Sequence, residues 1–132
     1  MLPTKEELKQ HLTEKMTNQD IANIYGTTFR KIIQLIKKYE LDQNKLRKID
    51  KFIVYEHWFN DGVIYVGSGV WYRCRRYTNR RNLEHRNLME QGKVMYKIVA
   101  EFDTQGEARK IESQLIKKYK NEGQAKFNKK RD

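Results

Sequence analysis

A carboxylate falls at a position of a predicted helix where an apolar side chain is expected. The helix begins after Thr104, which forms a capping-box pattern with Glu107, and apolar residues then recur at helical spacing. On a helical wheel Glu112 lies inside the apolar stripe, between Ala108 and Ile116. A carboxylate that faces a core is costly unless it meets a cation, a metal ion or a hydrogen-bond network. Glu112 is therefore either a site residue or a partly buried glutamate paired with an arginine.

Two tyrosines and a histidine are predicted to share one face of a β-hairpin. The segments before and after Asn-Asp-Gly at 60–62 are rich in β-branched and aromatic residues, and this turn sequence favours a three-residue loop. In that pairing His57 faces Tyr65 and Tyr55 faces Gly67, so all four positions project to the same side. We expect Gly67 to leave this face open beside the rings. The alternative is an ordinary tyrosine ladder on a sheet.

Arginines are concentrated between residues 71 and 90, where only Glu84 and Glu90 oppose them. They are Arg73, Arg75, Arg76, Arg80, Arg81 and Arg86. Arginine in preference to lysine indicates bidentate recognition of phosphate groups. The alternative is a solvated helix face, but so many like charges in a short span repel one another without an anionic partner.

The composition favours a nucleic-acid partner and excludes several classes. The 132 residues carry a net charge of +11, with a sequence pI near 9.7. No stretch is apolar enough for a membrane span, so no membrane partner is expected. The first residues lack the apolar core of a signal peptide, and the one cysteine, Cys74, fits a reducing compartment. We therefore expect a cytoplasmic protein without disulfides or a cysteine-rich zinc site.

Residues 1–45 are predicted to form a helical module. Thr4 and Glu7 fit a capping box, and a second helix follows Thr17. Gly26 permits a tight turn before a third helix, which Thr27 or Thr28 is expected to cap. The side chains expected to face inward in the second and third helices are Ile21, Ala22, Ile24, Tyr25, Phe29, Ile32, Ile33, Ile36 and Tyr39.

The run from Met16 to Leu41 resembles the helix-turn-helix of DNA-binding proteins. The resemblance implies that the third helix enters the major groove of double-stranded DNA. The residues expected to reach bases or phosphates are Thr28, Arg30, Lys31 and Gln34. The alternative is a three-helix packing module whose lysines face water.

A change in pattern after residue 45 predicts a second domain over residues 46–132. Residues 42–50 are polar enough for a linker, and strand patterns follow. A third strand is predicted over residues 94–102, with Val94, Tyr96, Ile98, Ala100 and Phe102 on one side. The predicted fold class is α+β, in which a small antiparallel three-stranded sheet is flanked by helices and preceded by the all-α module.

The second domain resembles the GIY-YIG nuclease family over residues 52–128. Ile53-Val54-Tyr55 and, ten residues on, Tyr65-Val66-Gly67 resemble the two elements that name the family. The further matches are Arg73, the pair Arg81-Asn82, Glu107-Ala108, Glu112, Leu115-Ile116, Tyr119 and Phe127-Asn128. The chain departs from the pattern at Ile53, Val66 and Ser68, where glycine, isoleucine and often lysine are expected. A commoner spacing would select Arg75 in place of Arg73.

The resemblance implies a divalent-metal-dependent DNA endonuclease, with one Mg²⁺ or Mn²⁺ held by Glu112 across a cleft from the two phenol rings. The arginine, Arg73 or Arg75, would neutralise charge on the phosphate. Tyr55 would act as base with its pKa lowered by arginines, and Tyr65 would orient the water, or the two roles are reversed. His57 is an alternative base.

Four further residues near the arginine cluster are expected to bind DNA, and one residue is expected to orient the site. The DNA-binding candidates are Arg76, Arg80, Arg81 and His85, and His85 is also an alternative to His57 as the family histidine. Asn128 is expected to orient the site by hydrogen bonding. Restriction, homing and phage or mobile-element nucleases would all use such a domain. The alternative function is a non-catalytic DNA-binding regulator or architectural protein.

Overall fold

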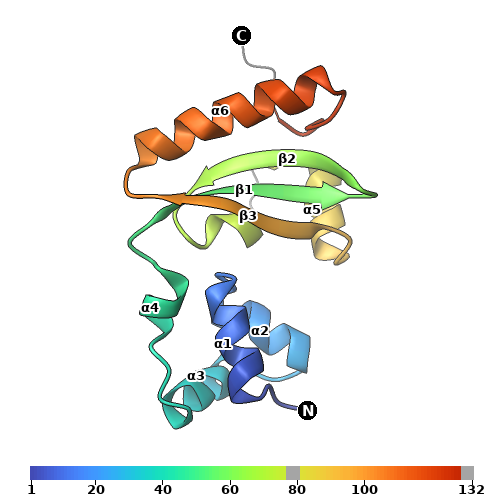
Figure 1. Cartoon of the computed structure of the whole chain (residues 1–132). Coiled ribbons are helices and arrows are strands. Elements are labelled where there is room, and N and C mark those ends of the chain that lie inside the picture. The colour runs from blue at the N-terminus through green and yellow to red at the C-terminus, as the bar shows by residue number, and fades with distance from the viewer. Residues whose placement is uncertain (77–80, 129–132) are drawn as a thin grey trace. The chain divides into compact units, whose positions relative to one another are not determined.

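The computed structural model describes residues 1–76 and 81–128, and the chain divides into two units, 1–50 and 51–132. The fold class is α+β, with six α-helices and one three-stranded antiparallel sheet among the described residues (Figure 1). The first unit holds α1 Lys5–Thr13, α2 Asn18–Tyr25, α3 Phe29–Lys38 and α4 Gln43–Arg47. The second holds β1 Phe52–Phe59, β2 Gly62–Gly69, the 3-10 turn η1 Arg73–Arg75, α5 Leu83–Glu90, β3 Met95–Phe102 and α6 Gln105–Asn121.

Threonine side chains begin the first three helices, as the sequence predicts. Thr4 accepts a hydrogen bond from the backbone N–H of Glu7, and the Glu7 carboxylate accepts one from the backbone N–H of Thr4. Thr17 begins α2 in the same way, and Thr28 caps α3. Gly26 ends α2 in the left-handed conformation at φ +63°, which only glycine adopts without strain.

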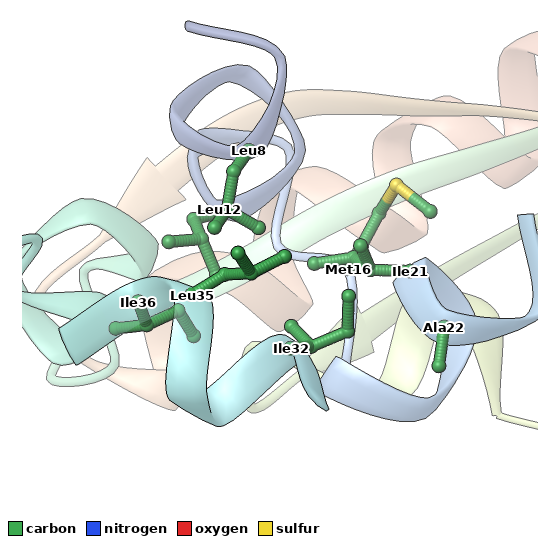
Figure 2. Close-up of a cluster of buried hydrophobic side chains, with 8 residues drawn as sticks. All are labelled: Leu8, Leu12, Met16, Ile21, Ala22, Ile32, Leu35 and Ile36. Atoms are coloured by element: carbon green, nitrogen blue, oxygen red, sulfur yellow. The ribbon is translucent and has the colours of Figure 1, made fainter. Parts of the chain in front are cut away.

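The three helices enclose a continuous apolar core. Figure 2 shows its buried members, Leu8, Leu12, Met16, Ile21, Ala22, Ile32, Leu35 and Ile36. Three of the residues predicted to face inward do not belong to it, since Ile24 is 56% exposed, Phe29 is 45% exposed, and Ile33 is half-buried outside the cluster. The apolar stripe of α3 is wider than the buried surface, which is centred on Ile32, Leu35 and Ile36. The prediction placed Phe29 in the core because spacing alone cannot show how much of a stripe is covered.

The stretch predicted as a linker contains α4. Asp42 caps this short helix, and Arg47 at its end is only 3% exposed. The Arg47 guanidinium donates to the backbone carbonyl of Met16 at 2.9 Å and to side-chain oxygens of Asn18 and Gln43. Burial lowers the pKa of Arg47 to about 10. These bonds keep residues 43–47 in the first unit, so the division falls after Asp50, later than the predicted boundary at 45/46.

The sheet has the strand order β2-β1-β3, and helices cover both faces. In Figure 1 α6 runs along one face and α5 lies on the other. Side chains of β1 alternate between these faces, with Val54 in the cluster that packs on α6 and Tyr55 in the cluster that contains Cys74 of η1.

The hairpin turn differs from the prediction, but the register of the site residues agrees with it. Asn60 and Asp61 both have positive φ, 51° and 63°, which makes a two-residue turn that matches strand twist better than the three-residue loop. Trp58 therefore pairs with Val63, and a β-bulge at Ile64 absorbs one residue of β2. Beyond the bulge His57 pairs with Tyr65 and Tyr55 with Gly67, as predicted.

A second bulge changes the faces of β3. Tyr55 pairs with Ile98 while Val54 pairs with Ala100, so Val99 is the extra residue. Tyr96 and Ile98 pack with Tyr55, whereas Phe102 packs in the cluster under α6. The prediction of one shared side is therefore wrong, because simple alternation does not anticipate a bulge.

Gly67 makes room for the Tyr55 ring, and the expected opening on this face is filled. A Cβ at Gly67 would lie 2.4 Å from both Cζ and the hydroxyl oxygen of Tyr55, and Tyr55 is 1% exposed. The ring cannot move aside without leaving its packed position.

Gly67→Ala is expected to lower the free energy of unfolding by about 1–3 kcal/mol, because the added methyl group overlaps a buried ring. Urea unfolding followed by circular dichroism measures this change. The matched control is Gly106→Ala in the first turn of α6, where an added Cβ meets no atom within 4 Å. That variant should be as stable as the parent or more stable by up to about 1 kcal/mol. Equal stabilities of the two variants would contradict this packing.

Candidate functional site

Glu112 is buried on α6 and has one neutral hydrogen-bond partner. Its exposure is 9%, and it lies one turn from the buried residues Ala108 and Ile116, as predicted. Its Oε1 accepts a hydrogen bond from the Ser68 hydroxyl at 3.2 Å. Within residues 1–76 and 81–128 no lysine, arginine or histidine forms an ion pair with it. A buried carboxylate with a single hydroxyl donor retains capacity for a cation.

A second buried carboxylate on the same face differs from Glu112, and the sequence prediction missed it. Glu56 is 2% exposed and accepts hydrogen bonds from the Tyr119 hydroxyl at 2.6 Å and from Trp58 Nε1 at 2.9 Å. Burial and the Glu56 carboxylate raise the pKa of Tyr119 to about 12, so Tyr119 stays a donor. Two donors satisfy Glu56, which gives it a structural role. The sequence could have indicated this burial, because Glu56 lies between Val54 and Trp58 in the strand alternation, and both of these apolar residues face α6.

The sheet lies between Glu112 and the predicted tyrosines. Ser68 pairs with Val54, so it projects to the α6 face, where it contacts Glu112. Tyr55 pairs with Gly67 and projects to the opposite face. The expected arrangement, with the acid and the rings across one cleft, is therefore wrong. The prediction followed the order of motifs along the chain, which does not fix the faces.

Aromatic rings and histidines fill the face opposite α6. The ring centroids of Tyr55, His57 and Tyr65 lie 5.4–6.2 Å from one another, which confirms their predicted shared face. His85 from α5 joins them, 5.0 Å from both His57 and Tyr65, and stacks on Phe127 at 4.7 Å. These rings form a packed layer, and the Arg81 guanidinium lies over its Tyr65 ring.

His57 and His85 form a buried neutral pair. His57 Nε2 donates to the backbone carbonyl of Cys74 at 2.6 Å, because a carbonyl only accepts. In neutral His57 the other nitrogen, Nδ1, is then an acceptor, and His85 Nε2 donates to it at 2.8 Å. Burial, with the Arg81 charge, holds the pKa of His57 well below its usual range and lowers that of His85 to about 4. At 0% and 1% exposure neither is available as a base or as a DNA contact, contrary to both predictions.

Tyr55 does not have the properties predicted for a general base. Burial raises its pKa to about 12, although Arg81 acts in the opposite direction. The Arg81 guanidinium lies 3.5 Å from the Tyr55 hydroxyl and 5.1 Å from the centre of the Tyr65 ring. Tyr65 is partly exposed, so it is the tyrosine of the pair that solvent reaches.

The two alternative arginines point to different edges of the sheet. Arg73 is exposed, and its Cδ lies 2.5 Å from where a Cβ of Gly69 would stand, so its side chain packs over Gly69 at the end of β2. Arg75 stacks on Tyr96 of β3 at 4.5 Å, over the other edge strand. The geometry therefore associates Arg73 with β2, the strand whose Ser68 contacts Glu112 of α6.

The C-terminal segment covers part of the outer edge of β2. Asn128 accepts from the backbone N–H of Val66 and donates to its carbonyl, both at 2.8 Å. The Gln124 side chain accepts from the N–H of Val63, and the N–H groups of Ala125 and Phe127 donate to the carbonyls of Val63 and Ile64. Residues 124–128 therefore pair with this edge although they form no strand. In an antiparallel strand every second residue directs its backbone N–H and C=O away from the neighbouring strand, so the backbone groups of Ser68 face this outer edge, as those of Val66 do. Within the described residues no hydrogen bond to the Ser68 backbone is formed there.

The remaining predicted DNA contacts are mostly accessible. Thr28, Arg30 and Gln34 of α3 are exposed, and Lys31 is half-buried. In the second unit Arg76 is exposed beside the Tyr72 ring, while Arg81 is held by the backbone carbonyls of Arg73 and Arg76. Arg80 lies outside the described residues.

No protein-family model matches the chain, and no curated protein or solved structure matches it. The described residues contain no cluster of three or more histidine, cysteine, aspartate or glutamate side chains placed to bind a metal ion. Each helix in the described ranges is too short or too polar to cross a bilayer.

The histidine pair predicts a loss of stability on mild acidification. Unfolded histidine takes up a proton near pH 6.5, whereas His85 resists protonation until about pH 4 in the folded state. Between these values the unfolded state binds more protons, so the free energy of unfolding should fall as pH falls, by up to about 1.4 kcal/mol per pH unit for each histidine. Urea unfolding between pH 7 and pH 5 measures the slope.

The control for this effect is His85→Gln, which keeps a donor toward His57 and removes one titrating group. Its free energy of unfolding should depend less steeply on pH than that of the parent chain. The two proteins differ in no other ionisable group, so the difference between the slopes isolates His85. Identical slopes would contradict a buried neutral His85.

Proposed function

We propose that the chain is a divalent-metal-dependent DNA endonuclease that binds its phosphodiester at the outer edge of β2, beside Ser68. The supporting observation is the convergence of three groups on residues 67–69. Glu112 contacts Ser68 from the α6 face, Arg73 packs over Gly69 on the other face, and the Ser68 backbone points outward between them. Because β2 is the edge strand, a phosphate bound beside it can contact side chains from both faces of the sheet.

The residues fit one oxygen-seeking cation. Glu112 supplies a single buried carboxylate, and its one hydrogen-bond partner among the described residues is the neutral Ser68 hydroxyl. Mg²⁺ commonly binds one or two carboxylates together with water and phosphate oxygens. A divalent ion bound there would polarise the phosphate and stabilise the leaving oxygen. Ser68 orients Glu112 through its hydroxyl, in the place where the family resemblance leads us to expect lysine.

The other groups have roles that follow from their positions. Arg73 is exposed and adjacent to the strand edge, so it neutralises charge on the phosphoryl oxygens. Tyr65, partly exposed beside Arg81, orients the attacking water. Tyr55, His57 and His85 form a neutral, packed layer that supports β2 on the face opposite α6. Asn128 holds the edge of β2 at Val66 and so sets the position of Ser68.

The basic surface and the helical unit suit duplex DNA as the substrate. The chain carries a net charge of +11, and α3 presents Arg30 and Gln34 to solvent. The first unit supplies binding and the second the chemistry, which agrees with the resemblance to a helix-turn-helix and to GIY-YIG nucleases. One site cuts one strand at a time.

A non-catalytic DNA-binding protein is the second candidate, and one observation favours it. Tyr55 and His57 are buried, and the sheet separates them from Glu112, so the predicted two-tyrosine cleft is absent from the described residues. In that function Glu112 would be only a buried carboxylate held by Ser68. Binding would then be unaffected by chelators, and no strand would be cut.

Glu112→Gln separates the two candidates. The substitution keeps the size of the side chain and its ability to accept from Ser68, but removes the charge that holds a cation. We expect nicking of supercoiled plasmid DNA in Mg²⁺ or Mn²⁺ to fall about a hundredfold or more, with DNA binding retained. Gel electrophoresis of the plasmid forms measures nicking, and fluorescence anisotropy of a labelled duplex measures binding.

The matched control is Glu107→Gln, on the same helix but exposed. Glutamine serves the capping position as glutamate does, so this variant should nick at the parental rate. Undiminished cutting by Glu112→Gln, or no cutting by the parent chain in either metal, would contradict the nuclease proposal.

A further inference from the structure

The exposed face of α3 carries an apolar row beside a polar row. Phe29 and Ile33 are four residues apart, as are Arg30 and Gln34, so each pair lies along one side of the helix and the two rows are neighbours. Phe29 is 45% exposed and Ile33 is partly exposed, whereas Arg30 and Gln34 are exposed.

The core of the first unit does not need Phe29. Eight buried residues close that core, and Phe29 is not among them or among the partly buried residues packed against it. A phenylalanine with this much exposed ring loses the free energy that burial would provide. An apolar side chain left at the surface of a charged helix is a candidate for contact with a partner.

The charge of α3 determines which partner fits. The helix carries Arg30, Lys31, Lys37 and Lys38 and no acidic residue. A second copy of the chain would bring the same positive charges against them. Double-stranded DNA is a polyanion that also presents methyl groups, because each thymine places its 5-methyl group in the major groove.

We propose that Phe29 and Ile33 read thymine methyl groups in the major groove while Arg30 and Gln34 contact neighbouring base edges. This inference rests on the DNA binding of the proposed function, but not on cleavage. Apolar side chains distinguish thymine by its methyl group, whereas arginine and glutamine form hydrogen bonds with guanine and adenine. The recognised sequence therefore contains thymines at positions fixed relative to a purine.

Replacement of thymine by uracil tests this proposal, since uracil lacks only the methyl group. The full chain, in EDTA to prevent cutting, is used to select duplexes from a library with a randomised centre. The selected duplex is then synthesised with thymine and with deoxyuridine, and both affinities are measured by fluorescence anisotropy. We expect the parent chain to bind the uracil duplex about fourfold more weakly for each methyl group contacted.

Two variants locate the effect. Phe29→Ala should bind the thymine duplex more weakly and should no longer distinguish thymine from uracil to the parental extent. Ile24→Ala removes another exposed apolar side chain, on α2, and should keep the full discrimination. Both side chains are exposed, so neither substitution is expected to disturb folding.

Three results would overturn the inference. In the first, the parent chain binds both duplexes tightly and with equal affinity. That result would overturn the reading of methyl groups but would leave the DNA-binding function intact. Another is unchanged discrimination in Phe29→Ala. The third is a parental dimer in analytical ultracentrifugation that Phe29→Ala dissociates, which would assign the apolar row to self-association. Absence of any duplex binding would instead defeat the DNA-binding function itself, whereas failure to nick in Mg²⁺ concerns only Glu112.

Discussion

The hydrogen bond between Ser68 and Glu112 joins the edge of the sheet to α6, and the functional interpretation depends on it. The Glu112 carboxylate lies in a region enclosed by apolar residues, and this single bond from a neutral donor offsets only part of the free energy lost when water is removed from it. Glu56 is a buried carboxylate on the same face, but it accepts hydrogen bonds from two donors, Tyr119 and Trp58. This contrast supports the proposal that Glu112, and not Glu56, binds a cation.

The opposite face of the sheet supplies support instead of acid–base chemistry. Burial raises the pKa of Tyr55 and lowers those of His57 and His85, so all three stay neutral near pH 7. Their hydrogen bonds are directional, since the carbonyl of Cys74 fixes the tautomer of His57 and thereby that of His85. Arg81 rests on this layer. In the proposed function this neutral layer positions β2, and the charged groups act at the edge of that strand.

Local signals predicted the helices well and the site less completely. Capping threonines at 4, 17, 28 and 104 and the burial of Glu112 follow from short-range pattern. The hairpin register agreed because the bulge at Ile64 compensated for an incorrectly predicted turn. The faces of β3, the exposure of Phe29 and the burial of His85 depend on contacts between distant segments, which periodicity does not encode. The contact between Ser68 and Glu112 likewise depends on the packing of α6 on β2, which no local pattern indicates.

Site-resolved cation binding tests the central claim most directly. Mn²⁺ broadens the NMR signals of nuclei near its binding site, even when it binds weakly. In a titration of the isotope-labelled chain at low Mn²⁺ concentration, the account predicts that the backbone amide signals of Ser68 and Glu112 broaden before those of the exposed acidic residues. Broadening that begins at surface aspartates and glutamates while the signals of Ser68 and Glu112 stay sharp would contradict it.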